Sequence, residues 1–241
     1  MLVKDIRTKI STKEFAHCTD AILSLVLDRP RTEINDDDFI SEENAKYCEN
    51  LATDFTKSYA LIYQRGRTYF MDIPLEITKD VFPPVFATEP FINEILNKFG
   101  DKKKILEIGT GSGAMSIAIA KNIKDCEVIA TDISYKILNI AKRNIELNNA
   151  NVKLVKSDLF NDVIGKFDLI ISNPPQQKTE ILNKAEKEGK LITPKIASDG
   201  GVDGFYLYNR IKSQAKQFLN EDGALVLQYD GYTNIYKYNE L

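Results

Sequence analysis

Short apolar segments alternate with amphipathic ones from residue 105 onward, and this alternation most restricts what the chain can fold into. The apolar segments have the length of buried strands, and the stretches between them have the spacing of helices. Such a rhythm is typical of a doubly wound, Rossmann-like α/β sheet whose strands run mostly parallel. The expected strands are 105–108, 128–131, 152–155, 167–172 and 224–228, and the expected helices are 114–123, 135–147 and 205–218.

The beginning of the chain has a different pattern, and residues 1–58 are predicted to be helical. Ser11 begins a capping-box pattern ahead of the apolar residues 21–26, which predicts a helix start there. Ser41 is expected to cap a second long helix with one apolar face. These features indicate a small helical N-terminal domain.

Residues 60–77 alternate large apolar and polar side chains around one glycine, which predicts a β-hairpin. Pro83 and Pro84 mark a boundary after it. We therefore expect two domains: residues 1–80, helical and ending in the hairpin, and residues 81–241, which hold the α/β sheet.

Composition excludes several classes of function. The net charge of −3 does not favour a polyanionic partner, which argues against direct binding of nucleic acid. No apolar run approaches the ~18 residues of a membrane helix, and the N-terminus has no signal-peptide core, so a cytoplasmic protein without a membrane partner is expected. The three cysteines are widely spaced and His17 is the only histidine, so we predict no metal site.

A glycine-rich turn closes the first strand of the sheet and opens the next helix. Glycine lets the backbone approach a ligand closely. By itself the motif is also compatible with a plain strand–helix turn, or with a dinucleotide site, because the G-x-G-x-x-A spacing is satisfied as well. The residues of this turn that we expect to bind a cofactor are Gly109, Thr110, Gly111, Ser112 and Gly113.

Three carboxylates at successive strand ends favour one cofactor. Glu107 precedes the glycines, where it can accept hydrogen bonds from an ammonium group but would repel a pyrophosphate. Asp132 is placed to accept both ribose hydroxyls, with Ile133 beside it. Asp158 is placed to accept from the adenine amino group, with Leu159 against the purine. Ammonium, ribose and adenine without phosphate describe S-adenosylmethionine.

The tetrapeptide Asn173-Pro174-Pro175-Gln176 follows the buried strand 167–172. Proline has no N–H and a fixed φ, so this loop is rigid and rich in acceptors. Such a loop suits the gripping of a planar NH₂ group, and all four residues are predicted to bind substrate. Asn173 and Pro174 are the predicted catalytic residues, and we also count Asn173 among the cofactor contacts. For Asn173 alone, a turn residue bonded to its own backbone is the competing interpretation.

Two further motifs accompany the glycine turn Gly109–Gly113 and the segment Asn173-Pro174-Pro175: the turn Gly200-Gly201-Val202-Asp203-Gly204, and Thr88-Glu89. With these four motifs the chain resembles class I methyltransferases, and more narrowly the HemK/PrmC family of protein-glutamine N5-methyltransferases. The resemblance extends over nearly the whole chain, and the combination of Asn173-Pro174-Pro175 with the Gly200–Gly204 turn is its most specific part.

The resemblance implies methyl transfer from S-adenosylmethionine to a glutamine in the Gly-Gly-Gln loop of a peptide-chain release factor, with the N-terminal domain docking that partner. Gln176 stands where the family has an aromatic residue, so methyl acceptors other than a release-factor glutamine stay open. The alternatives are a small-molecule N- or O-methyltransferase, a nucleic-acid adenine N6-methyltransferase, and a non-catalytic cofactor-binding protein.

The end of the chain is short for this fold. Class I methyltransferases continue after their last parallel strand with a helix and an antiparallel strand pair, for which too few residues follow position 228. We expect either a bare sheet edge or one short strand from the tail.

Overall fold

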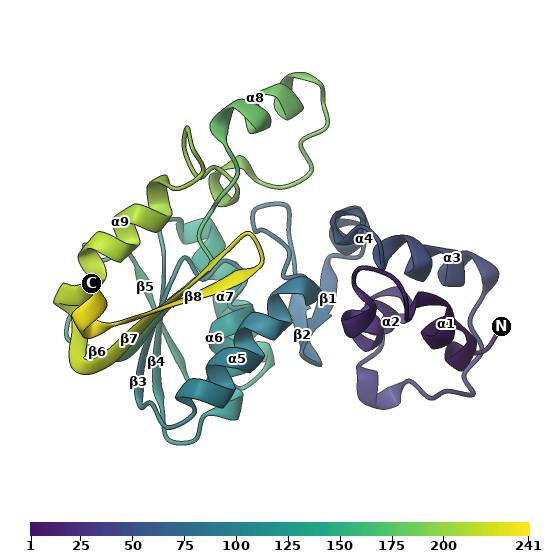
Figure 1. Cartoon of the computed structure of the whole chain (residues 1–241), viewed down its shortest axis with the longest axis horizontal. Coiled ribbons are helices and arrows are strands. Elements are labelled where there is room, and N and C mark those ends of the chain that lie inside the picture. The colour runs from purple at the N-terminus through teal and green to yellow at the C-terminus, as the bar shows by residue number, and fades with distance from the viewer. The chain divides into compact units, whose positions relative to one another are not determined.

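The computed structural model describes residues 1–241 and divides into two compact units (Figure 1). One unit comprises Met1–Thr78 and Pro83–Pro90, and the other comprises Lys79–Phe82 and Phe91–Leu241. The chain therefore crosses between the units more than once near the two consecutive prolines. None of its helices combines the length and the hydropathy needed to cross a lipid bilayer.

The first unit is helical and ends in a hairpin. Its elements are α1 (Val3–Ile10), α2 (Thr19–Leu27), α3 (Glu42–Leu51), α4 (Ser58–Arg65), β1 (Arg67–Phe70) and β2 (Ile73–Glu76). The predicted cap of α3 is confirmed, because Asn44 N donates to Ser41 Oγ at 3.1 Å. The predicted capping box at Ser11 is wrong, since Ser11 follows the last turn of α1 and no side chain caps α2.

The hairpin begins later than predicted. Residues 60–65 belong to α4, whose buried Tyr59 and Ile62 lie three residues apart on one face of the helix. Gly66 ends that helix with φ +68°, in the left-handed region that favours glycine. The antiparallel pairing of β1 with β2 follows directly, with Phe70 opposite Ile73.

The second unit is an α/β domain built around one sheet. Its elements are α5 (Glu89–Phe99), whose first two residues belong to the first unit, β3 (Lys104–Ile108), α6 (Ala114–Asn122), β4 (Glu127–Asp132), α7 (Tyr135–Leu147), β5 (Val152–Lys156), β6 (Phe167–Ser172), α8 (Thr179–Lys187), α9 (Tyr206–Ala215), β7 (Leu219–Tyr229) and β8 (Tyr232–Lys237). Every predicted strand and helix of this unit is present. Helices α5 and α8 were not predicted from the sequence.

The sheet has six strands in the order β5-β4-β3-β6-β7-β8. All neighbouring pairs are parallel except β7 with β8. From β3 the chain moves outward through β4 to β5, and it then returns to the other side of β3 with β6. The topological switch point therefore lies between β3 and β6, where open α/β sheets bind their ligands.

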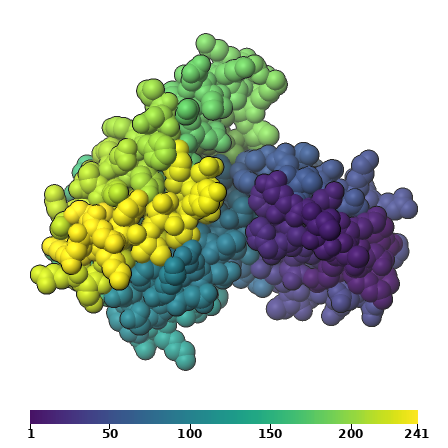
Figure 2. Space-filling model, viewed as in Figure 1, coloured from purple at the N-terminus to yellow at the C-terminus, as the bar shows by residue number.

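Helices cover both faces of this sheet, with α9 on one side and α6 and α7 on the other (Figure 1). The α9 side holds a buried apolar cluster that includes Phe167 and Ile170 of β6 and Ile211 of α9. Burying these side chains gives that face its main stabilisation. In Figure 2 the C-terminal hairpin, in yellow, lies beside the yellow-green α9 segment on the surface.

The end of the chain forms one short strand and does not leave β7 as a bare sheet edge. Six residues, Tyr232–Lys237, form β8 and pair antiparallel with Ala224–Tyr229 of β7. The edge of β7 is therefore not bare, and β8 with its half-buried side chains becomes the edge of the sheet. The turn between the strands is the two-residue loop Asp230-Gly231, with φ +49° and +77°. Positive φ at both positions suits a tight hairpin.

Candidate functional site

The glycine turn and the Asn-Pro-Pro loop leave neighbouring strands at the switch point. Glu107 of β3 pairs in register with Ile171 of β6, so the two strands end at the same level of the sheet. A buried hydrogen bond of 2.7 Å from Ser172 Oγ to Ile108 O ties these two strand ends together. The loop that begins at Asn173 therefore lies beside the glycine turn.

The glycine turn is fixed on its inner side and open on its outer side. The amides of Gly109 and Thr110 both donate to Thr131 O at the end of β4, at 2.9 and 2.8 Å. Gly109 and Gly111 have φ +75° and +57°, and a Cβ added at either would meet no atom within 4 Å. The positive φ and the open space together form a cradle in which a ligand can approach the backbone.

The last two residues of the turn lie in the interior. Ser112 is buried, and its carbonyl accepts from Asn144 Nδ2 of α7 at 2.8 Å. A Cβ on Gly113 would lie 3.5 Å from Ala141 of α7, so this glycine permits close packing of α6 on α7. In contrast to Gly109 and Gly111, these residues position the turn from behind.

Glu107 is fully buried in the sheet and only half satisfied. Its Oε2 accepts hydrogen bonds from Thr110 Oγ1 at 2.7 Å and from Ser116 Oγ. Its Oε1 is buried without a partner. Burial is the main cause that raises the pKa of this carboxyl to about 7, against the two hydroxyl bonds, which lower it. A buried acceptor without a donor is costly, and a cationic ligand group would relieve that cost.

Asp132 is held by the backbone of two loops. It is 8% exposed and accepts from Gly111 N at 3.1 Å and from Ser134 N at 3.2 Å. Burial raises the pKa of this carboxyl, although the backbone donors act in the opposite direction. The neighbouring Ile133 is 49% exposed, an apolar side chain left open beside the carboxylate.

Asp158 lies two residues beyond the end of β5 and is more exposed than the other two acids. Its Oδ1 is 3.5 Å from Arg210 Nη2 of α9, and 42% of its side chain is exposed. The next residue, Leu159, has φ +53° and packs partly buried against the apolar cluster under α9. The structure thus gives Asp158 a cationic partner that the sequence did not indicate.

The tetrapeptide after β6 is linked to the C-terminal hairpin. Pro174 is buried and its three neighbours are half-buried. Gln176 Nε2 donates to Asn173 Oδ1 at 3.1 Å, and Gln176 Oε1 accepts from Asp230 N at 2.6 Å. The predicted acceptor oxygen of Asn173 is therefore present at the site and already receives one hydrogen bond.

The Gly-Gly-x-Asp-Gly turn packs directly on this loop. A Cβ on Gly200 would lie 2.7 Å from Gln176 Cα, and one on Gly204 would lie 2.6 Å from Gln176 O. Hydrogen bonds of 2.8 Å join Gly200 N to Gln177 O and Gln177 N to Ser198 O. Two motifs that are separate in the sequence therefore form one backbone unit, in which glycine is required by close approach.

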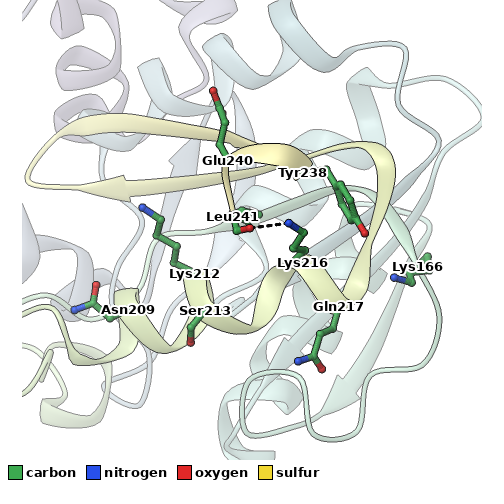
Figure 3. A pocket seen from close by; sticks show the side chains of 9 residues that line it. All are labelled: Lys166, Asn209, Lys212, Ser213, Lys216, Gln217, Tyr238, Glu240 and Leu241. Carbon is green, nitrogen blue, oxygen red and sulfur yellow. Dashed lines mark hydrogen bonds between the residues drawn. The ribbon is translucent and has the colours of Figure 1, made fainter.

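A surface hollow outside this site does not contribute to it. A surface hollow of about 580 Å³ contains Lys166, Lys212 and Lys216, the last of which donates to Leu241 O at 2.8 Å (Figure 3). Lys166 precedes β6, so this hollow lies at the opposite end of the strands from the glycine turn. No group of three or more His, Cys, Asp or Glu side chains in residues 1–241 is arranged to hold a metal ion.

Comparison with known proteins assigns the class first. A protein-family model described as "Methyltransferase small domain" matches residues 86–192. A solved methyltransferase from Pyrococcus furiosus has a TM-score of 0.51 and 27% identity, over 73% of this chain and 79% of that chain. With the doubly wound sheet and the open glycine turn, these matches define a class I methyltransferase, an enzyme that uses S-adenosylmethionine.

The closer relatives assign the family. "Release factor glutamine methyltransferase" of Geobacter sulfurreducens is 33% identical over 87% of this chain and 75% of its own length. The protein of that name from Clostridium botulinum is 30% identical over 95% of this chain and 86% of its own length. The chain belongs to the release factor glutamine methyltransferase family, which confirms the resemblance inferred from the motifs.

Some residues at the site were not found from the sequence. Ser116 donates to Glu107 from the first turn of α6, where a serine has no distinguishing signal. Arg210 and Asp230 reach the site only through the tertiary fold, from α9 and from the β7–β8 turn. The two signals that could be read from the sequence were the glycines and the strand-end acids.

Proposed function

We propose that this enzyme transfers a methyl group to the N5 nitrogen of a glutamine side chain in a peptide-chain release factor. The observation that carries the proposal is the adjacency of the Asn173 loop to the glycine turn of β3, secured by the bond from Ser172 to Ile108. The relatives bear the name of this reaction and match most of the chain, which supports the same substrate here.

The cofactor site proposed at the carboxyl ends of β3, β4 and β5 fits S-adenosylmethionine. The bound cofactor supplies a methyl group activated by a sulfonium. Glu107 Oε1, buried without a donor, is the acceptor for an ammonium group. Each carboxylate oxygen of Asp132 accepts one backbone hydrogen bond and has a further lone pair that can accept from a ribose hydroxyl. Asp158, Ile133 and Leu159 are assigned to the adenine end.

The acceptor is held by hydrogen bonds, because an amide nitrogen is a weak nucleophile. Its lone pair is delocalised into the carbonyl, so both N–H bonds must be directed if nitrogen is to face the methyl donor. Asn173 Oδ1 and the Pro174 carbonyl are the two acceptors assigned to this role. Good alignment of reacting groups supplies on the order of 7–11 kcal/mol in favourable cases. No general base is needed before attack, since the nitrogen becomes far more acidic once alkylated.

The helical N-terminal part, residues 1–80, is assigned to docking of the protein partner. It has its own apolar core, formed by side chains such as Ile22, Leu51 and Phe70. It contributes none of the cofactor or acceptor residues named above. A separate folded part beside a catalytic domain suits the recognition of a macromolecule more than that of a small molecule.

The role of Asn173 is tested with Asn173→Ala and purified release factor. Methyl transfer is followed with radiolabelled S-adenosylmethionine, and cofactor affinity is measured by calorimetry. We expect turnover to fall by at least about 100-fold, the scale of a lost positioning contact. Asn97→Ala, the same chemical change at an exposed position of α5, serves as the control. Turnover retained by Asn173→Ala with normal cofactor affinity would show that Asn173 does not hold the acceptor.

A further inference from the structure

Two hydrogen bonds in series connect the C-terminal hairpin to the proposed acceptor clamp. The backbone amide of Asp230 donates to Gln176 Oε1 at 2.6 Å, and Gln176 Nε2 donates to Asn173 Oδ1 at 3.1 Å. The three residues come from the β7–β8 turn and from the loop after β6. The side chain of Gln176 therefore joins the two.

The donor-to-acceptor direction of the two hydrogen bonds is fixed by the backbone amide of Asp230. A backbone amide donates a hydrogen bond and cannot accept one, so the side-chain oxygen of Gln176 must face Asp230. The nitrogen of the same carboxamide then faces Asn173, and Asn173 must present its oxygen to it. One of the two lone pairs on Asn173 Oδ1 is used, and the other remains for an N–H of the acceptor.

Both ends of the series are rigidly placed. Asp230 and Gly231 form the tight turn between the paired residues Tyr229 and Tyr232. The backbone of Gln176 has Gly200 and Gly204 packed against it. Neither anchor can shift without disturbing the sheet edge or the turn before α9.

We infer that Gln176 is a positioning residue for the methyl transfer, resting on the proposed function of the site. It transmits the fixed orientation of the Asp230 amide to Asn173 and sets which end of the Asn173 carboxamide serves the acceptor. A phenylalanine side chain at this position could not do so, because it has neither a hydrogen-bond donor nor an acceptor, and a tyrosine carries both on a single oxygen rather than on the two separate atoms of a carboxamide. The hairpin of β7 and β8 is thereby part of the catalytic arrangement.

The test compares two substitutions at the position with one beside it. Gln176→Met keeps the length of the side chain and removes both hydrogen bonds, whereas Gln176→Glu keeps the acceptor for Asp230 and, when ionised, loses the donor for Asn173. Gln177→Met makes the same chemical change one residue along, where the side chain is exposed. Each variant is assayed for kcat and for KM toward release factor, and cofactor affinity is measured separately.

We expect kcat to fall about tenfold in Gln176→Met, with KM and cofactor affinity unchanged, as for one lost hydrogen bond that positions a reacting group. The kcat of Gln176→Glu is expected to fall at least as far, and Gln177→Met is expected to keep the wild-type kcat. A wild-type kcat in Gln176→Met overturns the inference. So does a lower KM with a higher kcat, which would mean that Gln176 competes with the acceptor amide.

A second readout does not depend on activity. Hydrogen exchange of the Asp230 backbone amide, followed by NMR, is expected to be slow in the wild-type protein and fast in Gln176→Met. Unchanged protection of that amide in Gln176→Met overturns the inference. If the wild-type protein binds cofactor but methylates no release factor, the proposed function fails, while the exchange result still decides whether the hydrogen-bonded series exists.

Discussion

A side-chain carbon on Gly200 would lie 2.7 Å from Gln176 Cα, well inside van der Waals contact. The same carbon would lie 2.5 Å from the carbonyl oxygen of Gly204, so it is confined by backbone on two sides. The Gly200–Gly204 turn before α9 therefore supports the loop that follows β6. Its presence in the sequence is explained by packing, without any contact to a ligand.

Gly200→Ala is expected to displace the loop that holds Asn173. Overpacking against backbone costs about 1–3 kcal/mol of unfolding free energy, and a shift of the loop lowers kcat by on the order of 100-fold. Urea unfolding and the methyl-transfer assay measure the two effects. Gly189→Ala is the control for activity, because a Cβ there meets nothing within 4 Å; its own φ of +66° costs about 1–2 kcal/mol of stability, so it is not the control for unfolding. Full activity in Gly200→Ala would show that the two motifs are not coupled.

Gly111→Ala tests the open side of the glycine turn. The added methyl group meets no protein atom, so only the backbone strain at φ +57° acts on the free protein, about 1–2 kcal/mol. Cofactor affinity is expected to fall at least about tenfold, because the methyl group fills the cradle. Gly189→Ala, with φ +66°, carries the same strain away from the site. Equal cofactor affinity in the two variants by calorimetry would contradict a ligand at this turn.

Glu107 gives the ligand-free protein a specific pH dependence. Its pKa rises from 4.5 to about 7 on folding, so the unfolded chain ionises first and folding takes up a proton between these values. Stability from this group is therefore lost as the pH rises through that window. Glu107→Gln has no such group, so its stability relative to wild type should increase by on the order of 2 kcal/mol from about pH 5 to about pH 8.

Denaturant unfolding of both proteins at the two pH values measures this difference. Glu107→Gln can also change the stability by an amount that does not depend on pH. That amount does not affect the test, because the test uses only how the stability difference changes with pH. A difference that stays constant across the window would mean that Glu107 is ionised in the folded protein without a ligand.

Arg31 is expected to stabilise the first unit through Glu89. Glu89 is 6% exposed and accepts from Arg31 Nη2 and from Met71 N. Arg31→Met leaves that carboxylate without a cation and should cost about 2 kcal/mol, less than for a fully buried pair because Arg31 is partly exposed. A double-mutant cycle with Glu89→Gln isolates the pair. Lys4→Met, which breaks an exposed pair with Asp37, should have no measurable effect.

The sheet could be predicted because its strands are unbroken apolar runs between turn residues. β6 is the clearest case, with Phe167, Leu169, Ile170 and Ile171 all fully buried. Helix α8 was missed because it is only 9 residues long and buries only Leu182, so its apolar face is too small to stand out in the sequence. Helix α4 was misread because its large side chains also fit the two-residue spacing of a strand.

The site could be predicted only where a local pattern carries it. The glycines and the strand-end acids follow from the position of each residue on its own strand, so the places of Glu107 and Asp132 at the ends of β3 and β4 could be predicted. The partners of those residues come from remote parts of the chain. Asp158 meets Arg210, and Gln176 meets Asp230 across 54 positions, and no local spacing encodes either contact.

The most direct test of the central claim locates the transferred methyl group. Purified release factor is incubated with the enzyme and S-adenosylmethionine carrying a deuterated methyl group, and its peptides are sequenced by mass spectrometry. The predicted result is one labelled methyl on the side-chain nitrogen of the glutamine in the Gly-Gly-Gln loop, absent when Asn173→Ala replaces the enzyme. Label on another residue, or none from an enzyme that binds the cofactor, would contradict the account.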